Sequence, residues 1–487
     1  MSVTRRAQKW MRLEYRGGGS DAPPTRGSAG GMRGLLRSVV GSAASEADTK
    51  ARRSVMLGTL GIIALNVGTV ALNFALSLVL ARTLGSSGFG AYAFAFGWAV
   101  FLSVPASLGI SPLVVRCVSS YAEREEWGLL RGVIRRTNQV VLGASAVVVM
   151  VAAVVGLVLR DSRPELVGPF LVSLPLVPLI ALTGLRRSAM SGLHHVVLGR
   201  LPDTVVLTAV FLVLAGAAGV ILGDGFTAEW AVALNVVAGI VAFGLGAFLL
   251  RRTLPAQVRR AAPQYEDREW ARGGVSLFAV GLLFVLNGQI GTILLGTLDS
   301  ANAVGIYNVA TRAASFTSFL YLAATYPLFP NVARLWTAGD VVAIQRLLTR
   351  TGRIVSLFSV CVALGFVLFG DTLLGIFGGD FTEGVTALRI LVAAEVVKAV
   401  TGFGGLALMM TSHEGSMARG TALGVALNVV LAAVLIPLWG VNGAAAASAF
   451  GAVAGSVYVA WLTWRRLGIY APAIGAFGLR SRGRRPA

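Results

Sequence analysis

The chain has 487 residues, of which 55% are hydrophobic and 13% are charged, and its mean hydropathy is +0.75. These values exclude an ordinary soluble globular protein, which has less apolar and more charged sequence, and they indicate a membrane protein. The net charge of +20 does not indicate a nucleic-acid partner, because the basic residues are distributed between apolar segments and do not gather in one block.

The first 53 residues are rich in Gly, Ser and Arg and contain no long apolar run. We expect residues 1–53 to form a disordered basic cytoplasmic tail and not a secretory signal. The sequence TRR at 4–6 lacks the apolar core that follows a twin-arginine signal.

Twelve apolar segments follow, each long enough to cross a hydrocarbon core of about 30 Å. A helix needs about 20 apolar residues to cross, whereas a barrel strand needs about ten that alternate, so these segments predict helices. The expected fold class is an all-α polytopic membrane protein with about 12 transmembrane helices. The segments lie approximately at residues 57–81, 90–111, 138–159, 166–184, 204–222, 230–250, 274–296, 304–328, 354–376, 384–410, 420–437 and 443–463.

The loops between these segments predict the orientation of the chain. With the N-terminus inside, the inner segments and both tails sum to net +23, and the outer loops sum to −5. Lys and Arg stay on the cytoplasmic side of membrane proteins. We therefore expect a multi-pass protein of the cell (cytoplasmic) membrane whose N- and C-termini are both cytoplasmic, the C-terminal tail being residues 465–487.

An internal repeat divides the twelve segments into two sets of six. TLGSSGFGAY (83–92) resembles TLDSANAVGIY (297–307), and the Pro of SPL (111–113) recurs 215 residues later in YPL (326–328). Because six spans, an even number, separate the copies, the repeats are parallel. The sequence predicts an N-lobe at 54–250 and a C-lobe at 274–464 around a central cavity. The alternative is chance matching between apolar helices of similar composition.

The predicted lobes are joined by the basic segment RRTLPAQVRRAAPQYEDREWARG at 251–273. Its position between spans six and seven makes it a cytoplasmic linker.

Four further stretches are informative in their order and spacing: ARTLGSSGFGAYAFA (81–95), GQIGTILLGTLDSANAVGIYNVATRAASF (288–316), LLGIFGGDFTEGVTALRIL (373–391) and LNVVLAAVLIPLWGVNGAAAASAFGAVAGS (427–456). Together they resemble the lipid-linked oligosaccharide flippases of polysaccharide biosynthesis. That family belongs to the superfamily that also contains the multidrug and toxin extruders and the lipid II flippase. The resemblance covers almost all of residues 55–467 and implies alternating access and a sugar chain on polyprenyl pyrophosphate.

The chain departs from that family at Gly291, where an acidic residue is often found. A cation-coupling acid is therefore absent from this position. Asn66 and Asn73 in the first span are seven residues apart and share one helix face. They are candidates for substrate contact, or for hydrogen bonds between helices.

Charged residues inside the predicted spans are the main site candidates, because each costs about 2.5–3.5 kcal/mol at bilayer depth. Counting about 1.5 Å per residue, Glu395 and Lys398 lie near the midplane of span ten, and Arg312 lies about 12 Å into span eight. Arg389 is shallower and is expected to reach outward or to a neighbouring helix. Glu395 and Lys398, three residues apart, are close enough to pair.

A cavity through which a pyrophosphate head group crosses the membrane needs fixed positive charges. Arg312 and Lys398 are candidates to bind the head, and Arg116, at the inner end of span two, is a candidate to receive it first or an interfacial anchor. Glu395 is a candidate for proton or cation coupling if it is not held by Lys398. If Glu395 and Lys398 neutralise each other, they form a structural pair instead.

The sequence contains none of the phosphate-loop, metalloprotease or serine-hydrolase motifs, so we expect no enzyme, no ATP use and no cofactor. We expect no metal site either, since His194 and His195 are adjacent without a nearby carboxylate or thiolate.

The function predicted is a flippase of lipid-linked oligosaccharide for cell-surface polysaccharide biosynthesis. Its expected partners are the lipid-linked oligosaccharide, membrane lipids and, in the assembly pathway, a polysaccharide polymerase and glycosyltransferases. One alternative is a multidrug or metabolite cation antiporter of the same superfamily. Another is a non-transporting scaffold or polymerase of polysaccharide assembly.

Overall fold

A computed structural model describes residues 30–161, 163–411 and 413–470, with most side chains from Gly68 onward. The chain separates into two compact units, residues 1–58 and 59–487, and the second contains all the features discussed below. Helix α2 (Gly30–Ser107) begins inside the range predicted to be disordered, in a stretch that contains several of the helix formers Ala, Arg and Leu. Residues 1–29 of the predicted N-terminal tail and 471–487 of the C-terminal tail lie outside the described residues.

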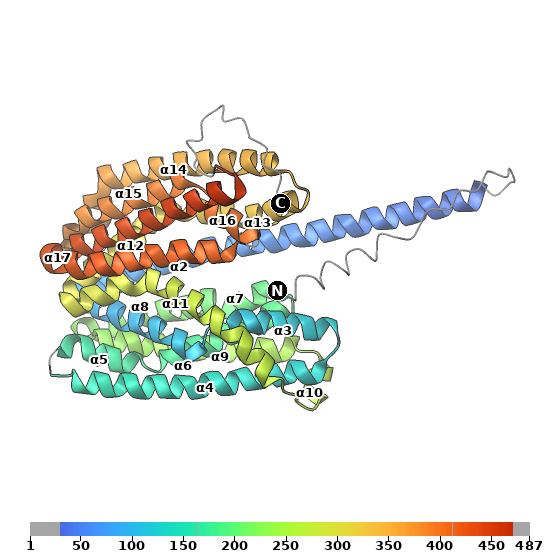
Figure 1. Cartoon of the computed structure of the whole chain (residues 1–487). Helices are drawn as coiled ribbons and strands as arrows, with labels where there is room; N and C mark the ends of the chain where they lie inside the picture. The colour runs from blue at the N-terminus through green and yellow to red at the C-terminus, as the bar shows by residue number, and fades with distance from the viewer. Residues whose placement is uncertain (1–29, 162, 412, 471–487) are drawn as a thin grey trace. The chain divides into compact units, whose positions relative to one another are not determined.

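The described residues form helices and contain no strand (Figure 1). In the first half of the chain α2 is followed by α3 (Ser111–Glu123), α4 (Trp127–Val158), α5 (Pro164–Ser173), α6 (Leu176–Gly192), α7 (Val196–Leu201), a π-helical turn (Pro202–Val206), α8 (Leu207–Leu222) and α9 (Ala228–Thr253).

The linker forms the short helix α10 (Ala256–Arg260) and the start of α11. The second half contains α11 (Asp267–Leu298), α12 (Ala301–Ser315), α13 (Phe319–Thr337), α14 (Val341–Gly375), α15 (Val385–Thr401), α16 (Gly404–Met410) and α17 (Glu414–Leu467).

Among the described residues, seven helices are long and apolar enough to cross a membrane, or eight if α15 and α16 form one broken span. Gly85 (φ 67°) interrupts α2 and Gly440 (φ 51°) interrupts α17, so each of these helices covers two of the predicted spans. Positive φ is readily adopted only by glycine, which explains the positions of both breaks. The polytopic helical fold is confirmed, and the number twelve stays a prediction.

The segments between the second and third and between the fourth and fifth predicted spans, which the orientation assigns to cytoplasmic loops, are largely helical instead. Residues 112–137 form α3 and the start of α4 with a turn at 124–126, and residues 185–203 continue α6 and form α7. Hydropathy marks where a helix is apolar, whereas the helix itself continues until a break or a turn, so the loop lengths were overestimated.

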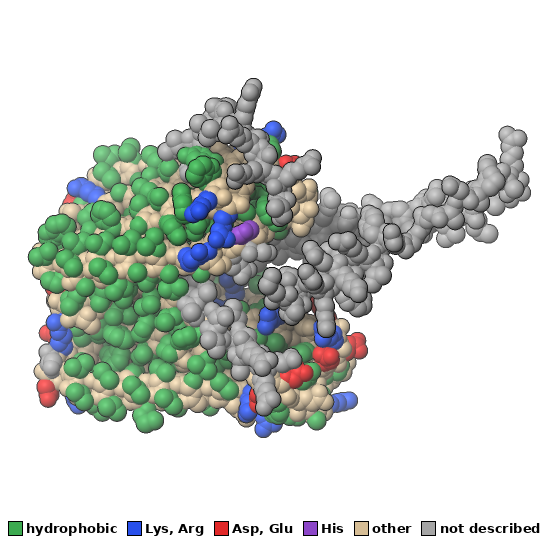
Figure 2. Space-filling model, in the orientation of Figure 1, with side chains coloured by type: hydrophobic (Ala, Val, Ile, Leu, Met, Phe, Trp, Pro, Cys, Tyr) green, Lys and Arg blue, Asp and Glu red, His purple; other side chains and the backbone are tan. Residues whose placement is uncertain are grey.

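Hydrophobic side chains are frequent on the part of the face in Figure 2 that is not drawn in grey, over the helices of both halves, and charged side chains lie in small groups at its left edge, near its centre and at its lower right. Exposed Val, Leu, Ile and Phe are frequent along α4, α8, α14 and α17. An exposed apolar surface of this extent indicates contact with lipid.

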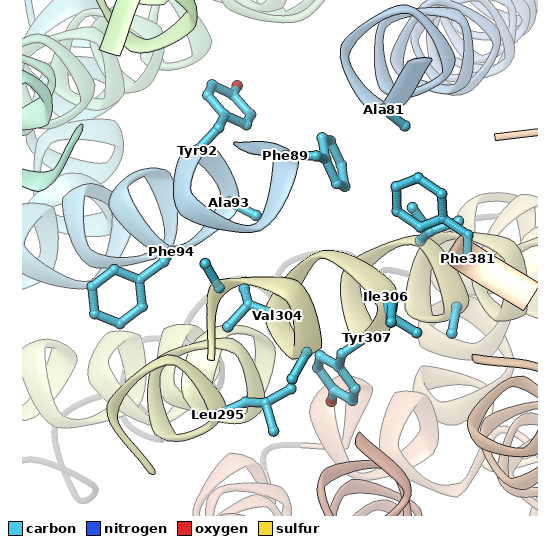
Figure 3. Packing of buried hydrophobic residues seen from close by; sticks show 14 of the residues in the cluster. Ala81, Phe89, Tyr92, Ala93, Phe94, Leu295, Val304, Ile306, Tyr307 and Phe381 are labelled. Carbon is cyan, nitrogen blue, oxygen red and sulfur yellow. The ribbon is translucent and has the colours of Figure 1, made fainter. Parts of the chain in front are cut away.

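A buried cluster joins residues of α2 to residues of α11 and α12 (Figure 3). At its centre Gly90 of α2 and Gly305 of α12 lie against each other. A Cβ on Gly90 would lie 1.7 Å from the Ala301 oxygen, and one on Gly305 would lie 2.0 Å from the Ser86 oxygen. Ser86 and Ala301, like Gly90 and Gly305, are separated by the repeat offset of 215 residues.

Tyr92 and Tyr307, also 215 residues apart, make corresponding hydrogen bonds. Asn235 Nδ2 of α9 donates to Tyr92 Oη over 3.0 Å, and Tyr307 Oη lies 2.9 Å from Ser448 Oγ of α17. Each tyrosine therefore binds the last long helix of its own half.

The linker is attached to α4 through its backbone. Gln264 N donates to Gly128 O over 3.0 Å, and Arg131 Nη1 donates to the oxygens of Arg259 (2.9 Å) and Ala261 (2.7 Å). Asp267, at the start of α11, accepts two hydrogen bonds from Arg136. These contacts hold the linker against the first half of the chain.

Candidate functional site

Arg312 lies in the last turn of α12 and connects the two halves of the chain. Its guanidinium donates to Ser77 Oγ of α2 and lies 5.8 Å from the ring centroid of Phe89, beyond the break at Gly85. The ring face attracts the guanidinium, and the hydroxyl satisfies only one of its five donors. Arg312 is therefore a fixed cation at the junction of α12 with α2.

Glu395 and Lys398 form an ion pair within α15. Lys398 Nζ donates to the two carboxylate oxygens of Glu395 over 2.7 and 2.9 Å, and Ser318 Oγ donates to Oε2 of the same carboxylate. The side chains are 39% (Lys398) and 21% (Glu395) exposed. The pair has no net charge, and the serine ties α15 to the segment between α12 and α13.

The charges of span ten do not act together with Arg312 in this structure. Within the described residues no hydrogen bond or ion pair links Arg312 to Glu395 or Lys398. Arg389 bonds a neighbouring helix: Nη2 donates to Val367 O of α14 over 3.3 Å and lies 3.9 Å from Asp371.

Among the described residues, neither Arg116 nor Asn73 bonds Arg312 through its side chain, although the backbone oxygen of Asn73 accepts from Ser77 Oγ over 2.6 Å. Arg116 is exposed on α3 and forms no hydrogen bond or ion pair with another described residue. Asn73 is exposed and donates from Nδ2 to Thr69 O of its own helix over 2.9 Å. The side chain of Asn66 lies outside the described residues.

The structure gives a physical reason for glycine at position 291. A Cβ there would lie 2.4 Å from Tyr307 Oη, which is itself held by Ser448. No acidic side chain fits beside that hydroxyl, so the site of the family's acid is filled by Tyr307. The sequence alone did not point to this tyrosine.

A buried charged cluster in the first half was missed because residues 185–203 were assigned to a loop. Arg186 is 5% exposed, donates to Phe243 O of α9 and lies 4.9 Å from the ring of Phe243. Glycine at 246 makes room for it, because a Cβ there would lie 2.3 Å from its Cζ.

The same cluster includes an acidic residue in the π-helical turn. Arg187 Nη1 donates to Asp203 Oδ2 over 2.7 Å, and the Asp203 side chain is 11% exposed. Asp203 is thus a second largely buried carboxylate besides Glu395, and it lies between two predicted spans.

The helical architecture matches that of solved transporters. The chain aligns over 84% of its length, and over 98% of the other chain, with a multidrug resistance MATE family transporter of the MOP superfamily in an inward-facing conformation, with a TM-score of 0.68 and 13% identity. The fold, with its apolar exterior, is that of a polytopic helical membrane protein. The chain belongs to the polysaccharide biosynthesis protein family, whose pattern matches residues 55–336.

Two relatives from Haloferax volcanii are named as flippases. The chain is 26% identical over 389 residues, 78% of each protein, to one named probable flippase AglR. It is 28% identical over 157 residues, 32% of this chain and 33% of the relative, to one named as a probable low-salt glycan biosynthesis flippase.

Proposed function

We propose that the chain is a flippase that moves an oligosaccharide on polyprenyl pyrophosphate from the cytoplasmic to the outer leaflet of the cell membrane for cell-surface polysaccharide biosynthesis. The family and the naming of AglR support the transport class. The observation that supports an anionic substrate is the position of Arg312, a fixed cation between α12 and α2. An anionic head crossing a low-dielectric layer needs such a charge.

The proposed movement is the rocking of two lobes, residues 54–250 and 274–464. The contact of Gly90 with Ala301 and of Gly305 with Ser86 is reciprocal, as expected where two-fold symmetry relates two surfaces. It supports a two-fold relation between the lobes, with the crossing of α2 and α12 as the place about which they turn.

Contacts at one end of the bundle support a closed state at the predicted outer side. Arg82 Nε donates to Ile376 O over 2.9 Å, and Ser86 Oγ donates to Asp380 Oδ2 over 3.2 Å. Arg163 Nη1 donates to the oxygens of Gly296 (2.9 Å) and Asp299 (2.6 Å). All four bonds run between the first and second halves of the chain, and outward opening would break them.

A cation antiporter of the same fold is the alternative. Such a protein needs a carboxylate free to bind the cation or a proton. Glu395 is held by Lys398 and Ser318, and Arg312 adds positive charge, so the junction suits an anion better. A role without transport, or as a polymerase, lacks a comparable observation.

The assay is flipping by the purified chain in proteoliposomes. A fluorescent polyprenyl-pyrophosphate oligosaccharide is placed in both leaflets, and its exposure to an impermeant quencher is followed over time. We expect the wild type and the exposed-residue control Arg124→Gln to expose the inner pool, and Arg312→Gln to lose most of this activity. Proteoliposomes that move no lipid-linked sugar but expel an organic cation would establish the antiporter instead.

A further inference from the structure

A groove with a volume of about 690 Å³ lies between α2, α4, α5 and the end of α11. This volume falls within the roughly 300–1,000 Å³ typical of small-molecule sites. One wall is aromatic, where Trp98 meets Phe94 and Phe170 edge-on with centroids 6.3 and 6.1 Å apart. We call this space the α4 groove, because residues of α4 from Val147 onward and Leu159, directly after the helix, form its opposite wall.

The α4 groove opens sideways, toward the surroundings of the helices. Val147, Val151 and Val155 of its wall are 57%, 59% and 49% exposed. The lining side chains are apolar except for Thr297 and Arg163. In a membrane such an opening faces hydrocarbon, so its occupant is a lipid chain and not a water-soluble molecule.

The length of the groove fits one leaflet. From Val147 to Leu159 the wall rises about 18 Å along α4 at 1.5 Å per residue. Half of a hydrocarbon core of about 30 Å is about 15 Å, so the groove spans one leaflet from the predicted outer end of α4.

The charged end of the groove is Arg163, directly before α5. Its Nη1 is engaged by the oxygens of Gly296 and Asp299, whereas Nε and Nη2 have no hydrogen-bond partner among the described residues. Asp161 and Glu165 flank it in sequence, are exposed, and form no ion pair with a described residue. A positioned guanidinium with two free nitrogens, which carry three N–H donors, suits a phosphate.

We propose that the α4 groove binds the polyprenyl chain of the lipid-linked substrate, with its phosphate at Arg163. This inference rests on the proposed flippase function and adds a place for the lipid part of the substrate. The wall beside Arg163 comes from α11, where a Cβ on Gly296 would lie 2.2 Å from Phe94 Cδ2. Separation of the lobes at this end removes that wall, so the groove exists only while the end is closed.

The test uses a polyprenyl phosphate that carries a diazirine in an isoprene unit, with the full-length protein in phosphatidylglycerol vesicles. After illumination, labelled peptides are located by mass spectrometry. We expect labels on α2 and α4 inside the groove. Val151→Trp, which fills the groove, should lower labelling about tenfold. The matched control is Val154→Trp, on the same helix and 57% exposed but outside the lining, and it should label like the wild type.

The charge contact is tested separately with a neutral polyprenol probe. Arg163→Gln should lower labelling by the phosphate probe and leave labelling by the polyprenol nearly unchanged, while Arg163→Lys keeps most of both. Equal competition by unlabelled phosphatidylglycerol and polyprenyl phosphate, or equal labelling around all lipid-facing helices, would overturn the proposal. If the protein flips the lipid but the label is spread evenly over the helices, the groove proposal is overturned and the flippase function stands. If the label is confined to the groove but the protein flips no lipid, the binding site is supported and the flippase function is overturned.

Discussion

Gly90 and Gly305 lie against each other at the crossing of α2 and α12, and each lies close to a backbone oxygen of the other helix. Because a Cβ on either would lie 2.0 Å or less from a backbone oxygen, a larger side chain forces the two helices apart. We expect Gly90→Ala and Gly305→Ala each to cost about 1–3 kcal/mol of stability, as overpacking of a close contact does.

The measurement is thermal unfolding of the purified protein in detergent. Gly143→Ala in α4 is the control, because nothing lies within 4 Å of a Cβ there. Equal melting temperatures for Gly90→Ala and Gly143→Ala would contradict the tight crossing.

The ion pair of α15 gives a second prediction. Glu395→Gln or Lys398→Met alone should lower the amount of folded protein, because each leaves one partly buried charge without its partner. The double variant should recover, with a coupling of about 0.5–1 kcal/mol, since both side chains are partly exposed. Protein level and surface polysaccharide are measured together. Loss of polysaccharide at normal protein level in all three variants would place the pair in the transport path.

Arg312 is predicted to need its planar shape as well as its charge. Arg312→Lys keeps the cation but cannot hold Ser77 and a phosphate with separate parallel donors. We expect it to fold like the wild type and to flip lipid-linked oligosaccharide more slowly, whereas Ser77→Ala should have a smaller effect. The initial rate at which the fluorescent lipid becomes accessible to the quencher is compared between these variants and the wild type. An Arg312→Lys variant with the wild-type rate would show that charge alone suffices.

Closure at the predicted outer end should be reversible during transport. Cysteines replacing Ser86 and Asp380, whose Oγ and Oδ2 are 3.2 Å apart, should cross-link in a background without Cys117 and Cys361 and block flipping. A reductant should restore the activity.

The matched control for this cross-link is at the linker. Cysteines replacing Arg136 and Asp267 join the linker to α4, and we expect this cross-link to leave flipping intact, because the linker is already fastened there. Inhibition by this second cross-link would mean that the linker leaves α4 during each cycle.

The linker contact also predicts a pH dependence. Tyr121 Oη donates to Glu266 Oε2 over 2.9 Å and accepts from Trp270 Nε1 over 3.1 Å. Burial raises the pKa of Tyr121 to about 12, from the ordinary 10.0. The folded state therefore favours the neutral phenol, so this stabilisation is fully present below pH 10 and is lost as the pH rises toward 12.

We expect Tyr121→Phe to be less stable than the wild type at pH 8, with a difference that narrows between pH 10 and 12. The rate of proteolytic cleavage within residues 255–266, followed as a function of pH in both proteins, measures this difference. A stability difference that stays constant between pH 10 and 12 would contradict the raised pKa of Tyr121.

Hydropathy was enough to predict a polytopic helical membrane protein, because the cost of burying backbone polar groups in lipid leaves few alternatives to helices. Arg186 could not be placed in this way. Its burial depends on α9, sixty residues later, where glycine at 246 leaves room for the guanidinium. The partners of Arg312 and Glu395, Ser77 and Ser318, are likewise small hydroxyl residues that no sequence pattern distinguishes.

The packing of Gly291 against Tyr307 restricts how this chain can change over evolutionary time. An acid at 291 becomes possible only after Tyr307 has been replaced by a smaller side chain, and that replacement first gives up the bond to Ser448. A change at either position alone carries a penalty. Among relatives of this chain, the identities at these two positions should therefore change together, as glycine with tyrosine or as an acid with a small residue.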